Sequence, residues 1–153
     1  MAGRAPVAAN FAAFVVFILS LWMFSGSRDS APALLLASMG SPLAIAGAVL
    51  ILRSRAALGS AWSLVPAADQ ATGLITTGPY RLVRHPIYLG LALVAMGNAV
   101  AFFNWPAAAI VLCGIVPTFA WRARTEERVL SRTFGERYAQ YRERTRMIIP
   151  RVL

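Results

Sequence analysis

Four long apolar runs that contain no charged residue constrain what this chain can fold into. They cover residues 7–24, 32–52, 87–103 and 106–121. As helices rising about 1.5 Å per residue they would extend roughly 24 to 32 Å, which suits a hydrocarbon core about 30 Å thick. We therefore predict an all-α integral membrane protein with about four transmembrane helices.

The charge composition agrees with this class. Hydrophobic residues make up 58% of the chain and charged residues only 14%, whereas soluble domains carry about a quarter charged residues. The net charge of +9 comes from arginines that flank the apolar runs, as in membrane proteins, and not from a basic face on a soluble domain. We expect the lipid bilayer as a partner and no nucleic acid. With one His and one Cys, no metal site is expected.

The distribution of the arginines predicts the orientation. If the N-terminus is cytoplasmic, 14 of the 15 arginines face inside and only Arg28 faces outside. The positive-inside rule then places both termini in the cytoplasm, as expected for a multi-pass protein of a prokaryotic inner membrane. Alternatively, the first run is a cleaved signal peptide, because Ser25-Gly26-Ser27 resembles a small-residue cleavage site.

The connections between the runs predict how the helices pack. Only Asn104 and Trp105 separate the third helix from Pro106, which suits the first turn of the fourth. We therefore expect a tight antiparallel hairpin of helices three and four. In the second helix, small residues recur at four-residue spacing and would allow a close approach of backbones. They are Gly40, Ala44 and Ala48.

The segment from 122 to 144 is rich in Arg and Glu and carries one apolar stripe, interrupted at Gly135. The stripe consists of Leu130, Phe134, Tyr138 and Tyr141. This pattern predicts a C-terminal amphipathic cytoplasmic helix. Such a helix would lie either on the membrane surface or as a cap over the ends of the spanning helices.

The turn before the third helix brings polar side chains against an apolar segment. His85 precedes Pro86 at a helix start, where unpaired backbone N–H groups favour an anion such as a ligand carboxylate. Tyr80 and Tyr88 flank it with aromatic rings and hydroxyls. Arg81 and Arg84 are expected to mark the cytoplasmic helix end and to extend to the lipid headgroups.

A second polar group follows the fourth helix. Glu126 and Glu127 are the carboxylates nearest its inner end, and Arg122 lies one turn before Glu126 on the same face. Taken alone, the Arg122–Glu126 spacing is typical of an exposed surface ion pair. Together with the turn, it would form a pocket for a zwitterionic, partly aromatic cofactor at one membrane face.

Two blocks of sequence resemble the isoprenylcysteine carboxyl methyltransferase family and, more loosely, the related membrane phospholipid methyltransferases. They read "LITTGPYRLVRHPIYLG" from Leu74 and "RARTEERVLSRTFGERYAQYRERTRMIIP" from Arg122. With the weaker "LGSAW" at Leu58–Trp62, the resemblance covers residues 58–150. It implies a single membrane domain over 1–153, in which 1–57 form an N-terminal helical pair and 58–150 the methyltransferase-like core.

The resemblance implies a methyltransferase that depends on S-adenosylmethionine and acts at the cytoplasmic membrane face. The acceptor would be lipophilic or small and would carry a carboxylate, amine or thiol. Arg122 would bind it, and Arg122 and Glu126 would be the catalytic residues. The cofactor pocket would be formed by Leu74, Ile75, Tyr80, His85, Pro86, Ile87, Tyr88 and Glu126.

Two other functions remain open from the sequence. One is an NADPH-dependent membrane reductase of sterol-reductase-like architecture, which need not carry a GxGxxG turn in a membrane fold. The other is a small non-enzymatic membrane subunit, in which Arg84, His85, Arg122 and Glu126 serve only topology and ion pairing. The sequence sets no oligomeric state.

Overall fold

The computed structural model describes residues 4–24, 31–59 and 73–149, and these residues form helices with no β-strand among them. The predicted all-α class is confirmed. The elements are α1 (Arg4–Met23), α2 (Ala31–Leu58), the 3-10 turn η2 (Gly78–Arg81), α3 (Pro86–Ala101), α4 (Trp105–Ile110), the π-helical turn η3 (Val111–Ile115), α5 (Val116–Phe134) and α6 (Glu136–Arg144). The suggested cleavage site at 25–27, Arg28 and residues 60–62 of the "LGSAW" motif lie outside the described residues.

All four predicted apolar helices are present. Three are long and apolar enough to cross a membrane, namely Ala5–Met23, Pro32–Leu58 and Trp105–Phe134. The remaining one, α3, has 16 residues and is therefore about 24 Å long. The chain is a membrane protein with several apolar helices.

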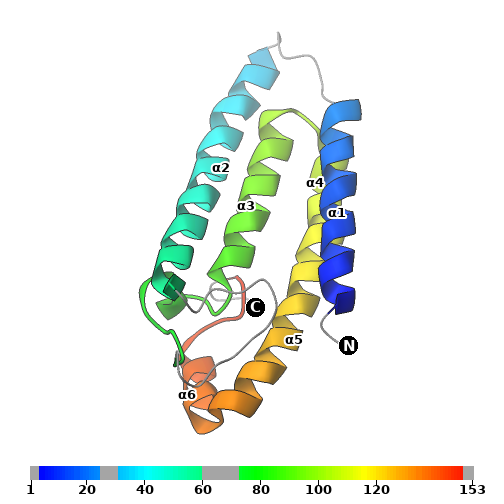
Figure 1. The fold of residues 1–153 in the computed structure, drawn as a ribbon. Helices are drawn as coiled ribbons and strands as arrows, with labels where there is room; N and C mark the ends of the chain where they lie inside the picture. Colours follow the sequence, from blue (N-terminus) through cyan, green and yellow to red (C-terminus); the bar gives the residue numbers. More distant parts are fainter. Residues whose placement is uncertain (1–3, 25–30, 60–72, 150–153) are drawn as a thin grey trace.

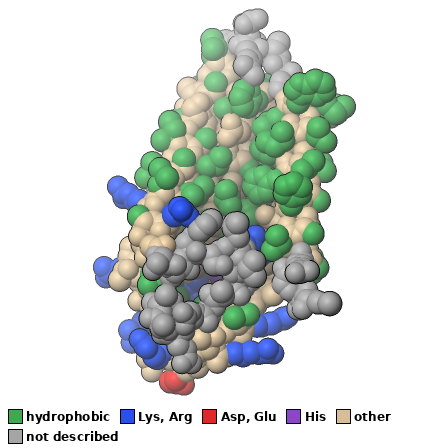
Figure 2. Space-filling view, in the orientation of Figure 1, with side chains coloured by type: hydrophobic (Ala, Val, Ile, Leu, Met, Phe, Trp, Pro, Cys, Tyr) green, Lys and Arg blue, Asp and Glu red, His purple; other side chains and the backbone are tan. Residues whose placement is uncertain are grey.

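The helices form two neighbouring pairs. Figure 1 shows α2 beside α3, and α1 beside the continuous helix made by α4 and α5. The starts of α1 and α3 lie at the same end of the molecule as α6. Figure 2 shows that the arginine side chains gather toward this end, while hydrophobic side chains predominate on the other part of the face among the described residues. We call it the arginine end.

The contact between α2 and α3 is a contact between backbones. A Cβ added to Gly97 would lie 2.5 Å from the nitrogen of Ala44, and one added to Gly47 would lie 2.6 Å from the carbonyl oxygen of Gly90. Gly40 and Ala44 take part as predicted. Ala48 is exposed, so this part of the prediction is wrong. Three-residue spacing places Gly47, and not Ala48, on the contact face.

The predicted tight hairpin of α3 and α4 is present and is fastened to α1 by one buried side chain. Asn104 precedes α4 and accepts a hydrogen bond from Ala107 N at 2.8 Å, which caps the helix. Its amide nitrogen donates to the carbonyl oxygen of Ser20 at 2.8 Å, and the Ser20 hydroxyl donates back to the amide oxygen at 3.3 Å. The hairpin turn is thus held against the end of α1.

The predicted amphipathic helix over 122–144 is not a separate element. The fourth span continues as α5 to Phe134, and the chain breaks at Gly135, which adopts φ +52°. Glycine is favoured there because positive φ strains other residues. Leu130 and Phe134 therefore lie on α5, whereas Tyr138 and Tyr141 are buried on α6. The sequence pattern after Trp121 marks where the helix changes from apolar to polar. It does not mark the end of the helix, which lies 13 residues further on.

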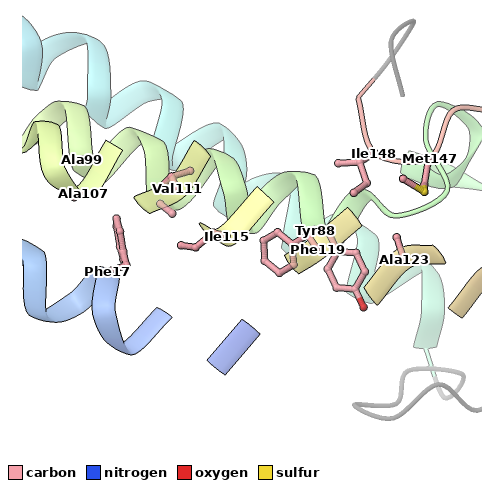
Figure 3. Close-up of a cluster of buried hydrophobic side chains, with 11 residues drawn as sticks. Phe17, Tyr88, Ala99, Ala107, Val111, Ile115, Phe119, Ala123, Met147 and Ile148 are labelled. Atoms are coloured by element: carbon pink, nitrogen blue, oxygen red, sulfur yellow. The ribbon is translucent and has the colours of Figure 1, made fainter. Parts of the chain in front are cut away.

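The apolar core follows the length of the long helix. Figure 3 shows Val111, Ile115 and Phe119 in succession along it, with Phe17 of α1 near the Val111 end. All four side chains are buried. Toward the arginine end the cluster continues into Met147 and Ile148, beside Tyr88. The core therefore extends to the predicted functional residues.

Candidate active site

The segment before α3 is held by the last described residues of the chain. Val83 forms a parallel bridge with Arg146. The backbone N–H of Arg84 donates to the Arg146 carbonyl at 2.8 Å, and that of His85 donates to the Met147 carbonyl at 2.9 Å. The C-terminal segment therefore fixes the backbone at the point where His85 enters α3.

Glu126 lies at the centre of a group of polar side chains. Its Oε1 accepts a hydrogen bond from the Tyr88 hydroxyl and one from Arg122 Nε at 3.2 Å. Its Oε2 lies 3.4 Å from His85 Nδ1. The Glu126 side chain stays 19% exposed, so this paired carboxylate is still accessible from outside. The structure thus brings together the start of α3 and the middle of α5.

Glu127 forms a second ion pair in the same group. Arg84 Nε lies 2.6 Å from Glu127 Oε1, and His85 Nε2 lies 3.6 Å from the same oxygen. Arg84 Nη1 also donates to the carbonyls of Arg142 and Thr145 at the end of α6. The prediction that Arg84 extends to the headgroups is wrong, because its side chain is only 9% exposed. Helix-end carbonyls and a carboxylate together satisfy its donors.

His85 is buried between these two carboxylates. Burial by itself would lower the pKa of His85, but its interactions with the nearby carboxylates of Glu126 and Glu127 outweigh burial and raise that pKa above its ordinary value. A protonated ring directs one N–H toward each carboxylate. Its Nε2 nevertheless has no hydrogen-bond partner within bonding distance among the described residues.

Aromatic rings form the wall beside this polar group. The Tyr88 ring stacks with the His85 ring at 5.5 Å between centroids and with the Phe119 ring at 4.9 Å. The Arg122 guanidinium carbon lies 5.5 Å from the Tyr88 centroid, within cation–π range. Figure 3 shows Tyr88 and Phe119 next to each other at this end of the core. The site therefore combines ionic groups with π-faces that suit cations.

The other predicted site residues differ in their burial and contacts. Tyr80 is buried, and its carbonyl accepts a hydrogen bond from the Tyr141 hydroxyl at 2.7 Å. Burial, then Tyr141, then Glu126 raise the pKa of Tyr80 well above its ordinary value. Pro86 is the buried first residue of α3. The remaining three are half-buried apolar residues outside the hydrogen-bonded group, namely Leu74, Ile75 and Ile87.

The sequence did not predict the partnership of Arg84 with Glu127 or the support from α6. A signal for the first was present, because Arg84-His85 and Glu126-Glu127 are adjacent cations and adjacent carboxylates. Two such pairs meet most favourably when each cation finds its own carboxylate. Within the described residues there is no group of three or more His, Cys, Asp or Glu side chains that could hold a metal ion.

Comparison with known proteins gives a consistent set of similarities. A family model described as "Phospholipid methyltransferase" matches residues 35–137. The chain is 38% identical over 83 residues to protein-S-isoprenylcysteine O-methyltransferase A of Arabidopsis thaliana, covering 54% of this chain and 42% of that protein. It is 30% identical over 139 residues to the cobalt-zinc-cadmium resistance protein CzcN of Cupriavidus metallidurans. That match covers 90% of this chain and 61% of CzcN.

A solved structure shares the fold. The structure of a eukaryotic intramembrane Ras methyltransferase, an isoprenylcysteine carboxyl methyltransferase, superposes with a TM-score of 0.66 at 22% sequence identity. The match covers 95% of this chain and 52% of that one. The chain therefore spans less than two thirds of each of these three proteins.

Proposed function

The chain belongs to the phospholipid methyltransferase family, and from that premise we propose that it transfers a methyl group from S-adenosylmethionine to a lipophilic or small acceptor. The resemblance to isoprenylcysteine carboxyl methyltransferases expected from the sequence is confirmed by the relatives and the shared fold. The acceptor class is a carboxylate, amine or thiol. The division into 1–57 and 58–150 stays a prediction.

One observation carries the proposal. Glu126 is a partly exposed carboxylate that receives hydrogen bonds from Tyr88, 38 residues earlier in the chain, and from Arg122. His85 lies on its other oxygen. Such convergence of distant ionic and aromatic groups is typical of a ligand site and is uncommon in a merely structural helix end.

The chemistry of these residues fits the proposed cofactor. S-adenosylmethionine, when bound, supplies an electrophilic methyl group on a sulfonium sulfur. Glu126 would hold its ammonium or ribose hydroxyls, while His85 would hold its carboxylate. The backbone N–H groups of His85, Tyr88 and Leu89 at the start of α3 already donate to carbonyls, so the His85 ring would supply the main contact. The unpartnered Nε2 of His85 is a donor that such an anion would satisfy. Tyr80 and Tyr88 would offer aromatic faces to the positive charge. The apolar walls would come from Leu74, Ile75, Pro86 and Ile87.

Arg122 would orient an anionic acceptor. A guanidinium carries five N–H donors, so Arg122 can contact Glu126 and an acceptor carboxylate at the same time. A carboxylate or thiolate acceptor needs no proton removed. The residues of the site then contribute by aligning the acceptor and excluding water, which can lower a barrier by several kcal/mol. Arg122 and Glu126 are accordingly the proposed catalytic residues.

The proposed orientation places the site at the cytoplasmic face. The described arginines gather toward the end of the molecule that carries the site (Figure 2), as the positive-inside rule requires of a cytoplasmic end. A water-borne methyl donor would reach this end directly, and a lipophilic acceptor would arrive from the bilayer.

Calorimetric titration of the detergent-purified chain with S-adenosylhomocysteine tests the function. We expect saturable binding that weakens about tenfold or more in Glu126→Gln, because a charged hydrogen bond to the ligand is lost. Glu136→Gln removes the same charge at an exposed position on α6 and should bind like the parent. Absence of binding by the folded parent, or preferential binding of NADPH, would contradict the proposal.

A further inference from the structure

An open hollow at the arginine end is lined mainly by arginines. It has a volume of about 420 Å³ and lies between α5 and α6. The lining residues are Arg124, Glu127, Arg128, Ser131, Arg132 and Arg142. Four guanidinium groups thus surround a space that contains a single carboxylate.

The charge of the hollow is poorly compensated by the chain itself. Glu127 is already paired with Arg84 at 2.6 Å, outside the lining. In the part of the chain that the structure describes, none of the four lining guanidinium groups forms an ion pair. Like charges one helical turn apart repel each other, as Arg124, Arg128 and Arg132 do along α5. An external anion would relieve this repulsion.

The position of the hollow along the span indicates where that anion comes from. Trp121, at 48% exposure, lies on the same face of α5 as Arg128 and Arg132, within about 20° at 100° per residue. Exposed Trp105 marks the far end of the same continuous helix. The two tryptophans are about 24 Å apart along the axis. Tryptophans concentrate at the two membrane interfaces, so Trp121 marks the interface on the side of the hollow, and the long side chains of the arginines that follow it can extend back toward the headgroups.

We propose that this hollow binds the phosphate of an anionic phospholipid headgroup. Arg128 and Arg132 would reach it from α5 and Arg142 from α6, with forked contacts to phosphate oxygens. The acyl chains would lie along the apolar surface of the span beyond Trp121. By contacting arginines of both helices, the lipid would link α5 to α6 at the hollow. This binding is separate from the proposed methyl transfer and does not require it.

The test measures binding of short-chain lipids to the delipidated, detergent-purified full chain by microscale thermophoresis. The probes are dioctanoyl phosphatidylglycerol, dioctanoyl phosphatidylcholine and glycerol phosphate. We expect phosphatidylglycerol to bind at least about tenfold more tightly than the other two, because only it combines a net negative headgroup with acyl chains.

Two double variants separate the hollow from general surface charge. Arg128→Gln/Arg132→Gln should weaken phosphatidylglycerol binding about 25-fold, roughly fivefold for each arginine. Arg53→Gln/Arg81→Gln removes the same charge from exposed positions outside the hollow and should stay within about twofold of the parent. Circular dichroism and gel filtration verify that both variants are folded.

Three results would overturn the inference. Equal loss in the two double variants would mean that only overall charge attracts the lipid. No loss in the folded Arg128→Gln/Arg132→Gln protein would mean that the lipid binds elsewhere. Glycerol phosphate binding as tightly as phosphatidylglycerol would assign the hollow to a soluble phosphate compound.

Discussion

At the scale of single residues, neighbours with the same sequence context have different roles. Arg81 and Arg84 both precede α3 and both were expected at the headgroups. Arg81 is exposed, whereas the half-buried Arg84 contacts Glu127 and two carbonyls at the end of α6. The sequence singled out His85, Arg122 and Glu126, which the structure brings together. It could not assign the carbonyl partners of Arg84, because these depend on how α6 folds back after Gly135.

The pairing of His85 with two carboxylates predicts a pH dependence of stability. Because its pKa in the folded protein is raised, His85 contributes stability fully at pH values below its ordinary pKa of about 6.5. That contribution is lost as the pH rises through the raised value. The temperature midpoint of unfolding in detergent should therefore decrease as the pH is raised above about 6.5.

The variant His85→Gln is the control for this effect. His85 is the only histidine of the chain. The His85→Gln variant should therefore be less stable than the parent at pH 6, and its unfolding midpoint should lack the part of the pH dependence that His85 contributes. The readout is the unfolding midpoint of both proteins across the same buffers. Parallel curves for the two proteins would show that His85 does not bind the extra proton in the folded state.

At the scale of helices, the existence of each apolar element was predictable and its full extent was not. Run length and the absence of charge specify a span. They do not specify where a helix ends, since backbone hydrogen bonding continues past Trp121 into a polar sequence. The π-helical turn at Val111–Ile115 was also beyond sequence reasoning. It lies before Pro117, whose missing N–H removes one regular helix hydrogen bond.

The backbone contact between α2 and α3 predicts a large effect from one methyl group. Gly97→Ala should destabilise the protein by about 1–3 kcal/mol, because its Cβ would lie 2.5 Å from Ala44 N and 2.7 Å from Gly40 O. Backbone atoms of a packed helix cannot move aside cheaply. Thermal unfolding in detergent measures the change.

Gly114→Ala is the matched substitution in the neighbouring helix. A Cβ there meets only side-chain atoms, at 3.8 Å from Ile110 and 3.9 Å from Ala13. It should leave stability unchanged or raise it by up to about 1 kcal/mol through helix propensity. Equal stability of Gly97→Ala and Gly114→Ala would show that α2 and α3 are not in backbone contact.

At the scale of the whole molecule, one end differs from the rest. α6, the start of α1 and the residues around Glu126 share it, and charge gathers toward it (Figures 1 and 2). Counting arginines in the sequence predicted one cytoplasmic face, and the residues of two segments predicted a pocket there. The sequence could not predict the basic hollow, because Arg142 meets the α5 arginines only after the chain reverses at Gly135.

The proposed orientation predicts which side of the membrane each end occupies. The test uses a Cys113→Ser background. In it, Ala139→Cys, at an exposed position on α6, should react with a membrane-impermeant maleimide in inside-out vesicles only. Met23→Cys, exposed near the opposite end, should react only from the outer side. The mass that the maleimide adds to the protein reports the labelling of each introduced cysteine. The reverse pattern would place the site on the outer face.

The ties between residues 83–85 and 146–147 have a consequence for biosynthesis. The span that begins at Pro86 enters the membrane long before residue 147 leaves the ribosome. Until then, the N–H groups of Arg84 and His85 lack their acceptors on Arg146 and Met147, and Arg84 lacks the carbonyls at the end of α6. In a nascent chain with all four apolar helices inserted, the backbone around His85 is therefore still unsecured, and the C-terminal segment completes this part of the fold last.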